Sequence, residues 1–379
     1  MRILAIETSC DDTGIAILEE KSGKFNVLSN IVSSQSIHQN YGGVFPMMAK
    51  REHQINIIPV LIQSLKEANL LVKKEKEEVN DKTLEDIFKK EKELFPLAKE
   101  FLENYKNPNT SPEPGRRIDA IAVTYGPGLE PCLWVGVNLA RALSYYWNIP
   151  IIPVNHIEAH MLVNFLENKN IKFPALSLIV SGGHTQLILM KGIGKYKIIG
   201  ETRDDAAGEC FDKCAKLLGL GYPGGPIISK IASEGSKDPV KLPRPMIHSK
   251  DYDFSFSGLK TAVLYETKGK ELTKEYVKNM AVGVQDAIIE VLLKKTLQAT
   301  KDFKVKTIIL GGGVSANSEL RSQFKLKVKS EKLKVNVIFP EKNLSTDNGL
   351  MIAVAGYFRK AKKIAWQKLS ANANLRVDG

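Results

Sequence analysis

The chain has 379 residues, 43% of them hydrophobic, and a formal net charge of +12. Its length is more than one domain usually holds, so we expect two lobes, and no apolar run reaches the about 18 residues of a membrane span. The basic excess favours an acidic partner, with nucleic acid first, over the alternative of a Lys-rich protein without a polyanion partner.

Hydrophobic periodicity alternates between strand-like and helix-like segments. Strand patterns occupy residues 2–7, 14–19, 25–33, 118–124, 151–154, 175–180, 185–190, 195–200, 307–310 and 335–339. Helical patterns occupy residues 48–70, 133–147, 207–219, 273–300, 315–329 and 346–362. The first strand breaks at Glu7, which argues against a signal peptide. The mixture of strands and helices indicates an α/β fold.

One order of elements occurs twice: a strand, a polar Gly-containing turn, two more strands and a helix. The first copy spans 2–70 with the turn inside ETSCDDTGIAIL, and the second spans 175–219 with the turn VSGGHT. The repetition predicts two related lobes, each presenting a polar hairpin to a shared cleft. An ordinary hairpin turn does not require the two aspartates, Thr13 and Gly14 together, so we expect this turn to have a function.

The segment 71–117 differs in composition from its surroundings. It is dense in Lys and Glu and ends in the Pro-rich NPNTSPEPG. Apolar residues recur within it at helical spacing, which predicts one or two amphipathic helices. We interpret it as an insert that elaborates the surface, with a docking surface for a partner as the alternative.

The chain's four cysteines fit no disulfide framework or zinc motif. Cys210 and Cys214 stand one helical turn apart, and we interpret them as buried helix positions. This usage favours a reducing compartment, so we expect a cytoplasmic protein.

The segment NHIEAH places His156 and His160 four residues apart, on one face of a helix, as two imidazoles sharing a metal require. Glu158 lies about 200° around that helix from His156, so it points away and a zinc-protease interpretation is disfavoured. The segment STDNG offers Asp347 as a third ligand at a helix start. The alternatives are an incidental histidine pair and an aspartate that only stabilises the helix dipole.

Three glycine-rich loops accompany these residues. VSGGHT lets backbone N–H groups approach an anion, LGYPGGP follows a helix and can wrap a flat ligand, and LGGGVSAN lies between a strand and a helix. Together with the acidic hairpin they favour a nucleotide cleft. None matches the Walker pattern, so a P-loop enzyme is excluded.

Nine motifs occur here in the order found in one known family. They are ETSCDDTGIA, GGVFP, YGPGL, NHIEAH, VSGGHTQL, DDAAGECFDKCAKLLGLGYPGGP, FSFSGLKTA, GGGVSAN and STDNG. On these motifs the chain resembles the TsaD family, the tRNA adenosine threonylcarbamoyltransferases, from residue 1 to about residue 357, the insert excepted. Asp12, Met47, Met48 and the tail NANLRVDG depart from the family pattern, and they concern partner and tRNA surfaces more than the cleft.

The resemblance implies the duplicated two-lobe actin-like ATPase (ASKHA) fold, with the cleft between the lobes. We expect residues 1–160 to form the N-terminal lobe, with the insert 71–117, and residues 161–379 to form the C-terminal lobe, with the last helix packing back on the N-terminal lobe. The family transfers a threonylcarbamoyl group from threonylcarbamoyl-AMP to the N6 amine of the tRNA adenosine 3′ of the anticodon. Implied partners are tRNA, a paralogous non-catalytic subunit and a small ATPase.

The resemblance also implies site residues. His156, His160 and Asp347 match the ligands of one divalent metal ion, iron or zinc. Asp11 matches an acidic residue implicated in activity. The acyl-adenylate would be held at Val180, Ser181, Gly182, Gly183, His184, Asp212, Gly225 and Asn317.

Two alternatives come from other functional classes. A sugar kinase or ATPase of the same fold would need a sugar pocket and would leave the two histidines unexplained. A non-catalytic scaffold paralogue would be expected to lose the metal and phosphate residues, and this chain retains them.

Overall fold

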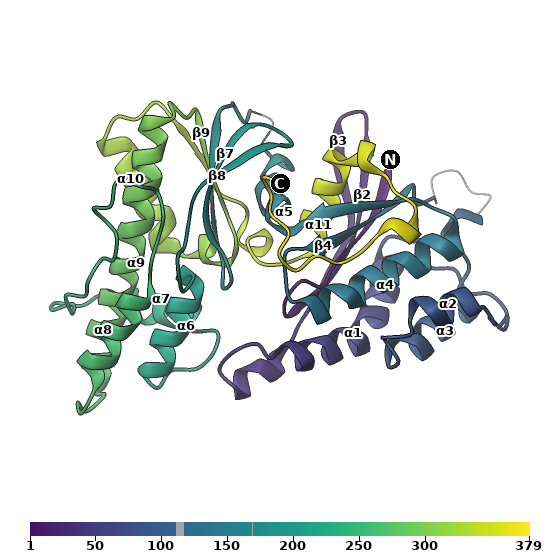
Figure 1. Cartoon of the computed structure of the whole chain (residues 1–379), viewed down its shortest axis with the longest axis horizontal. Coiled ribbons are helices and arrows are strands. Elements are labelled where there is room, and N and C mark those ends of the chain that lie inside the picture. Colours follow the sequence, from purple (N-terminus) through teal and green to yellow (C-terminus); the bar gives the residue numbers. More distant parts are fainter. Residues whose placement is uncertain (111–116, 169) are drawn as a thin grey trace.

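Two five-stranded sheets with one strand order dominate the computed structural model, which describes residues 1–110, 117–168 and 170–379 (Figure 1). The first sheet has the order β3-β2-β1-β4-β5, formed by β1 (Arg2–Glu7), β2 (Asp12–Lys21), β3 (Lys24–Ser34), β4 (Ala120–Gly126) and β5 (Ile151–Asn155). The second has the order β8-β7-β6-β9-β10, formed by β6 (Ala175–Val180), β7 (Thr185–Gly192), β8 (Lys195–Glu201), β9 (Thr307–Gly311) and β10 (Asn336–Ile338).

Strand directions repeat as well. In each sheet the first three strands form an antiparallel meander, and two parallel strands extend the other side of the first strand. The central strands are buried on both faces, which explains why RILAIE and ALSLIV are nearly continuous apolar runs. The repetition confirms the duplicated two-lobe actin-like fold that the sequence predicts.

Helices cover the outer faces of both sheets. The first sheet is covered by α1 (Pro46–Glu67) and α4 (Glu130–Trp147). The second sheet's outer side carries α6 (Ala207–Leu217), α7 (Gly224–Ala232), α8 (Ser257–Thr267), α9 (Lys274–Asp302) and α10 (Ser318–Ser330). The sequence patterns missed α7 and α8, because both helices are short and Gly- or Ser-containing at their starts.

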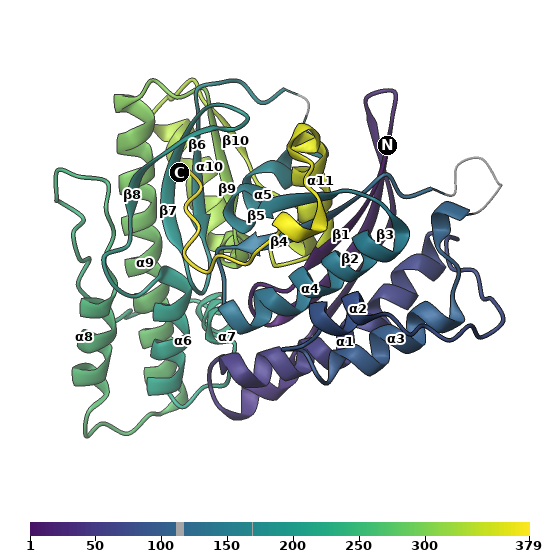
Figure 2. The same cartoon turned by 45° about the vertical axis from the view of Figure 1, so that its right-hand side comes forward.

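Two short helices lie between the sheets (Figures 1 and 2). They are α5 (His156–Leu162) and α11 (Gly349–Phe358). Helix α11 packs against β1 and β2, while α5 contacts both α11 and the strands β6 and β9. Together they form one apolar cluster with both sheets, so this pair joins the two halves of the molecule.

The segment 71–117 forms α2 (Lys82–Ile87) and α3 (Leu94–Asn104) in its described part, confirming the predicted helices; residues 111–116 lie outside the described residues. Its apolar residues join the core under α1 and α4. Tyr145 on α4 donates its hydroxyl to Asp81, the residue that caps α2, at 2.9 Å. Across the described ranges, no helix combines the length and apolar character that crossing a membrane requires.

Candidate active site

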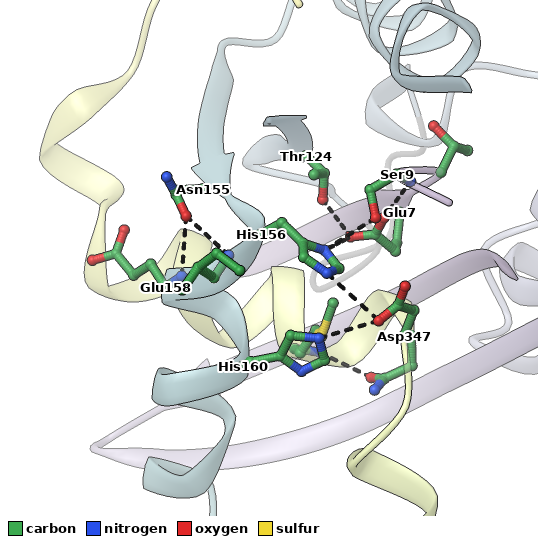
Figure 3. A network of polar contacts seen from close by, with 12 residues as sticks. Glu7, Ser9, Thr124, Asn155, His156, Glu158, His160 and Asp347 are labelled. Atoms are coloured by element: carbon green, nitrogen blue, oxygen red, sulfur yellow. Dashed lines mark hydrogen bonds and ion pairs between the residues drawn. The ribbon is translucent and has the colours of Figure 1, made fainter. Parts of the chain in front are cut away.

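Helix α5 begins directly where β5 ends, because Asn155 accepts hydrogen bonds from the N–H groups of Ile157 and Glu158 at 2.9 and 3.2 Å. This cap fixes the first turn, which carries His156, and His160 follows one turn later. The two imidazole rings lie 4.7 Å apart between centroids and nearly perpendicular, at 84° (Figure 3).

Asp347 reaches the two histidines from the segment before α11. Its Oδ1 lies 3.1 Å from Nε2 of His160 and 3.6 Å from Nε2 of His156. All three potential ligand atoms lie within 4.8 Å of one another. Two ligands of a tetrahedral zinc, each about 2.0–2.1 Å from it, are about 3.3–3.4 Å apart, so these atoms fit one small cation. The structure thus brings together the three residues that the sequence singles out, and the donor set suits zinc or iron.

The charges in this cluster attract a cation. Burial by itself lowers the pKa of His156, but the carboxylates of Asp347 and Glu7 outweigh it and raise the pKa to about 9. Burial raises the pKa of Asp347, but His156 and His160 together hold it well below its usual range. Burial and the two neighbouring histidines lower the pKa of His184 to about 4, so its imidazole is neutral beside the cluster.

Glu158 faces away from the histidines, as its position on the helix predicts (Figure 3). It accepts a hydrogen bond from the hydroxyl of Tyr196 at 2.7 Å, and Arg359 pairs with both of its oxygens at 2.8 and 2.9 Å. Its role is to hold β8 and the end of α11 against α5, and it does not contact the metal cluster.

The turn between β1 and β2 reaches the same region. Burial raises the pKa of Asp11, and the negative charge of Asp347 adds to this. The same two causes raise the pKa of Asp12 to about 7, although a hydrogen bond with Ser34 lowers it in part. Both carboxylates are therefore close enough to Asp347 to interact with it.

The second hairpin turn has an open centre. The N–H of Ser181 donates to the carbonyl of His184 at 2.8 Å, and the N–H of His184 donates to the Ser181 hydroxyl at 3.1 Å. Gly182 and Gly183 are exposed, and a Cβ on either would meet no atom within 4 Å. Val180, which precedes the turn, is buried at the end of β6. The turn is closed by its own hydrogen bonds and leaves space for a ligand above the glycines.

The remaining predicted residues come from the second lobe. Asp212 on α6 accepts a hydrogen bond from the N–H of Gly224 at 2.7 Å. Burial raises the pKa of Asp212 to about 6, although the N–H groups of Gly224 and Gly225 lower it in part. Gly225 lies in the first turn of α7, so LGYPGGP is half loop and half helix, whereas its composition predicts a loop alone. Asn317 caps α10 through the Leu320 N–H at 2.9 Å.

Tyr222 links the two lobes electrostatically. Burial raises the pKa of its phenol, and the carboxylates of Asp11 and Asp212 raise it further. Asp11 also contributes to the raised pKa of Asp212. Residues of the first hairpin and of the α6–α7 segment, which belong to different lobes, are therefore close enough to interact.

Sequence reasoning missed three residues behind the metal cluster, namely Glu7, Ser9 and Thr124. Glu7 and Ser9 belong to the first of the nine motifs, and this membership was the signal that the sequence offered. Thr124 stands in an apolar strand and carries no sequence signal, because only the pairing of β4 with β1 brings it to Glu7.

A duplicated actin-like fold with a His-His-Asp cluster between its lobes and an open glycine turn beside it defines a class of two-lobed α/β proteins with a candidate metal site. The solved structure of full-length HypF in its phosphate- and nucleotide-bound form shares the fold, with a TM-score of 0.51 and 12% identity, covering 95% of this chain and 55% of that one. At this identity the likeness concerns the fold alone.

The sequence comparisons are more specific. The sequence model of the TsaD family, tRNA N6-adenosine threonylcarbamoyltransferase, matches residues 26–76 and 91–354. Proteins named tRNA N6-adenosine threonylcarbamoyltransferase from Persephonella marina and Clostridium kluyveri are 42% and 44% identical, and these alignments cover 100% of this chain and 96% and 98% of the relatives. The chain belongs to the TsaD family and is a transferase of tRNA modification. Within the predicted insert only residues 77–90 fall outside the matched ranges.

Proposed function

We propose that this chain is a cytoplasmic, metal-dependent acyltransferase. It moves the threonylcarbamoyl group of threonylcarbamoyl-AMP to the N6 amine of the adenosine 3′ of the anticodon in tRNA and releases AMP. The observation that carries the proposal is the convergence of His156, His160 and Asp347 between the lobes, beside Asp11 and the second hairpin turn.

The reaction needs positioning and charge stabilisation more than a strong base. The adenosine amine is a poor nucleophile because its lone pair is delocalised into the ring, whereas the mixed anhydride is a good electrophile with AMP as leaving group. His156, His160 and Asp347 would hold zinc or iron, which when bound supplies a Lewis acid.

The chain's own residues then take separate tasks. The open turn from Val180 to His184 receives the phosphate of the acyl-adenylate, since Gly182 and Gly183 let a ligand approach the backbone closely. Asp212, Gly225 and Asn317 line the second-lobe side of the acyl-adenylate site. His184, the last residue of this turn, is neutral and close enough to the metal cluster to interact with it, so it adds no charge of its own.

Asp11 is assigned to the attacking amine. It orients the N6 amine or accepts its proton, and a carboxylate whose pKa is raised is a better base near neutral pH than an ordinary aspartate. The target base must be unstacked to reach the cleft, which costs less in an anticodon loop than in a duplex. A paralogous subunit and a small ATPase are the proposed protein partners.

The direct test is transfer to an unmodified tRNA transcript. Purified protein is mixed with threonylcarbamoyl-AMP and zinc or iron(II), with and without the two partner proteins, and the modified nucleoside is quantified by mass spectrometry. Formation of threonylcarbamoyladenosine at the position 3′ of the anticodon is expected. Absence of the product under every combination, with intact tRNA and donor, would refute the proposal. Sugar-dependent ATP hydrolysis would instead favour the kinase alternative.

A further inference from the structure

A buried carboxylate ties the helix that carries the two histidines to the first strand. Glu7, the last residue of β1, has 0% exposure, and its Oε2 lies 3.2 Å from Nδ1 of His156 (Figure 3). This is the ring nitrogen turned away from Asp347, whose Oδ1 faces Nε2. The imidazole of His156 is therefore held between two carboxylates, one on each nitrogen.

Glu7 is itself held in place by two donors. The N–H of Ser9 donates to Oε1 at 2.5 Å, and the hydroxyl of Thr124 on β4 donates to Oε2 at 2.6 Å. Both oxygens are thus anchored by groups of the first lobe, Oε1 by the turn after β1 and Oε2 by β4, which pairs in parallel with β1. Neither of these two hydrogen bonds involves the histidine.

These contacts determine which nitrogen of His156 carries a proton. A lone pair on Nδ1 would face an oxygen of Glu7 and be repelled by it, whereas an N–H there is attracted. The Ser9 hydroxyl, 3.1 Å from Nδ1, can accept the same hydrogen. A ring that gives up one proton to bind a cation therefore keeps its hydrogen on Nδ1, where Glu7 and Ser9 accept it, and presents the Nε2 lone pair to the cation that it would share with Asp347.

His160 lacks an equivalent partner. Its Nε2 faces Asp347 at 3.1 Å, but its buried Nδ1 has no hydrogen-bond partner among the described residues. The two histidines therefore differ: both face Asp347 through Nε2, but only His156 has a carboxylate behind its Nδ1 among the described residues.

We propose that Glu7 is a positioning residue for the metal site, which fixes the tautomer and ring orientation of His156 and makes Nε2 a stronger ligand. A carboxylate behind a metal-bound histidine commonly has this effect. Ser9, which donates to Glu7, lies two residues before Asp11, so the same carboxylate also keeps the first hairpin turn in register with the metal. The inference rests on the metal site of the proposed function and adds a residue to it.

The test measures zinc affinity of the metal-free, full-length protein by competition with a chromogenic chelator. Glu7→Gln, which keeps the shape, is expected to weaken zinc binding about 10- to 100-fold. Thr124→Val removes the hydroxyl that orients Glu7, so it should also weaken zinc binding, but by a smaller factor than Glu7→Gln does. The matched control is Glu158→Gln, a buried glutamate on α5 itself whose partners Tyr196 and Arg359 lie away from the cluster, and its zinc affinity should equal that of the wild type.

Two further readouts separate a positioning role from a purely structural one. The thermal midpoint of each metal-free variant shows whether the fold is weakened, and nitrogen-15 NMR of the zinc-loaded wild type should show a protected ring proton on Nδ1 of His156. If the metal-free wild type binds neither zinc nor iron(II), the metal site itself is refuted. If the wild type binds zinc and Glu7→Gln binds it equally well, or if the ring proton is on Nε2, Glu7 does not position the ligand. Should Glu7→Gln fail to fold, an unchanged zinc affinity of Thr124→Val would overturn the inference.

Discussion

Gly14 on β2 and Gly349 at the start of α11 pack backbone to backbone. A Cβ on Gly14 would lie 2.6 Å from the Gly349 nitrogen, and a Cβ on Gly349 would lie 2.5 Å from the nitrogen of Ala16. Gly349 follows Asp347 by two residues, so this approach sets how deeply the third candidate metal ligand reaches into the cleft. The glycine that made the first hairpin turn unusual in the sequence is thus required by a helix that comes more than 300 residues later in the chain.

The first prediction follows from this contact. Gly14→Ala and Gly349→Ala should each destabilise the protein by about 1–3 kcal/mol, because backbone cannot move aside as a flexible side chain can. Displacement of Asp347 should also weaken zinc binding. Urea unfolding and chelator competition measure the two effects. Gly192→Ala on β7, where a Cβ would meet no atom within 4 Å, is the control and should change neither quantity. Wild-type stability in both cleft variants would contradict the observed packing.

The metal ligands give the second prediction. His156→Ala, His160→Ala and Asp347→Ala should each lose bound metal and transfer activity while keeping the fold, since each removes one of the three candidate ligands found among the described residues. Elemental analysis and circular dichroism of the purified variants are the measurements. His248→Ala, at an exposed histidine, should retain full occupancy. Full metal occupancy in all three ligand variants would end the assignment.

The third prediction concerns Asp11. Asp11→Asn preserves shape and removes a charge that Asp347 repels, so stability and acyl-adenylate binding should be near normal or better. Transfer to tRNA in a single turnover should fall by about 100-fold or more, as for loss of a general base. The competing interpretation is an aspartate that only shapes the turn. Equal single-turnover rates for the variant and the wild type would decide for that interpretation.

Asp12 predicts a pH dependence of stability in the metal-free protein. Its pKa is about 7 in the fold, against about 3.9 in an unfolded chain. The folded state binds this proton more tightly, so the contribution of Asp12 favours folding below about pH 4 and is lost as the pH rises toward 7.

Asp12→Asn should therefore have a higher free energy of unfolding than the wild type at pH 8 and a smaller advantage at pH 5. The advantages at the two pH values should differ by roughly 1–3 kcal/mol after allowance for solvent screening. Urea unfolding in the presence of a chelator measures it at both pH values. Asp238→Asn, at an exposed aspartate, serves as the charge-matched control. A wild-type protein whose stability rises steadily from pH 5 to pH 8 relative to Asp12→Asn would contradict the burial of this carboxylate.

The fifth prediction concerns tRNA. Binding should weaken steeply with salt, because basic side chains that meet phosphates release counterions. Replacing Lys360, Lys362 and Lys363 by alanine should lower the slope of log affinity against log salt by about 1 for each lysine that binds a tRNA phosphate. Replacing the exposed Lys325, Lys327 and Lys329 on α10 changes the net charge equally and is the control. Identical slopes for the two triple variants would remove the C-terminal segment from the tRNA surface.

The strands and the longer helices were predictable because burial imposes periodicity on their sequences. RILAIE and ALSLIV were recognisable as strands, and the i, i+4 spacing of His156 and His160 predicted that both imidazoles lie on one face of a helix. Helix α7 was missed, because its first residues, Gly224 and Gly225, are typical of turns, and its packing against α6 and α9 is not visible in the local sequence.

The contacts behind the metal cluster could not be predicted from spacing. Glu7 contacts Thr124 because β4 pairs with β1, and that pairing depends on the packing of the whole sheet, not on either residue. Asp12 shows the same limit. Its place after a strand does not reveal that both it and Asp11 lie near Asp347, which follows more than 300 residues later in the chain.

The position of α11 has a consequence for biosynthesis. The strands of the first sheet leave the ribosome early, yet the helix that covers one face of β1 and β2 is encoded by residues 349–358. At a synthesis rate of about 5–20 residues per second, roughly 20–70 s separate the synthesis of β1 and β2 from that of α11. During that time the face formed by Ile3, Ala5 and Leu18 has no native cover, so nascent chains of this protein should need a chaperone that shields apolar strands until synthesis is nearly complete.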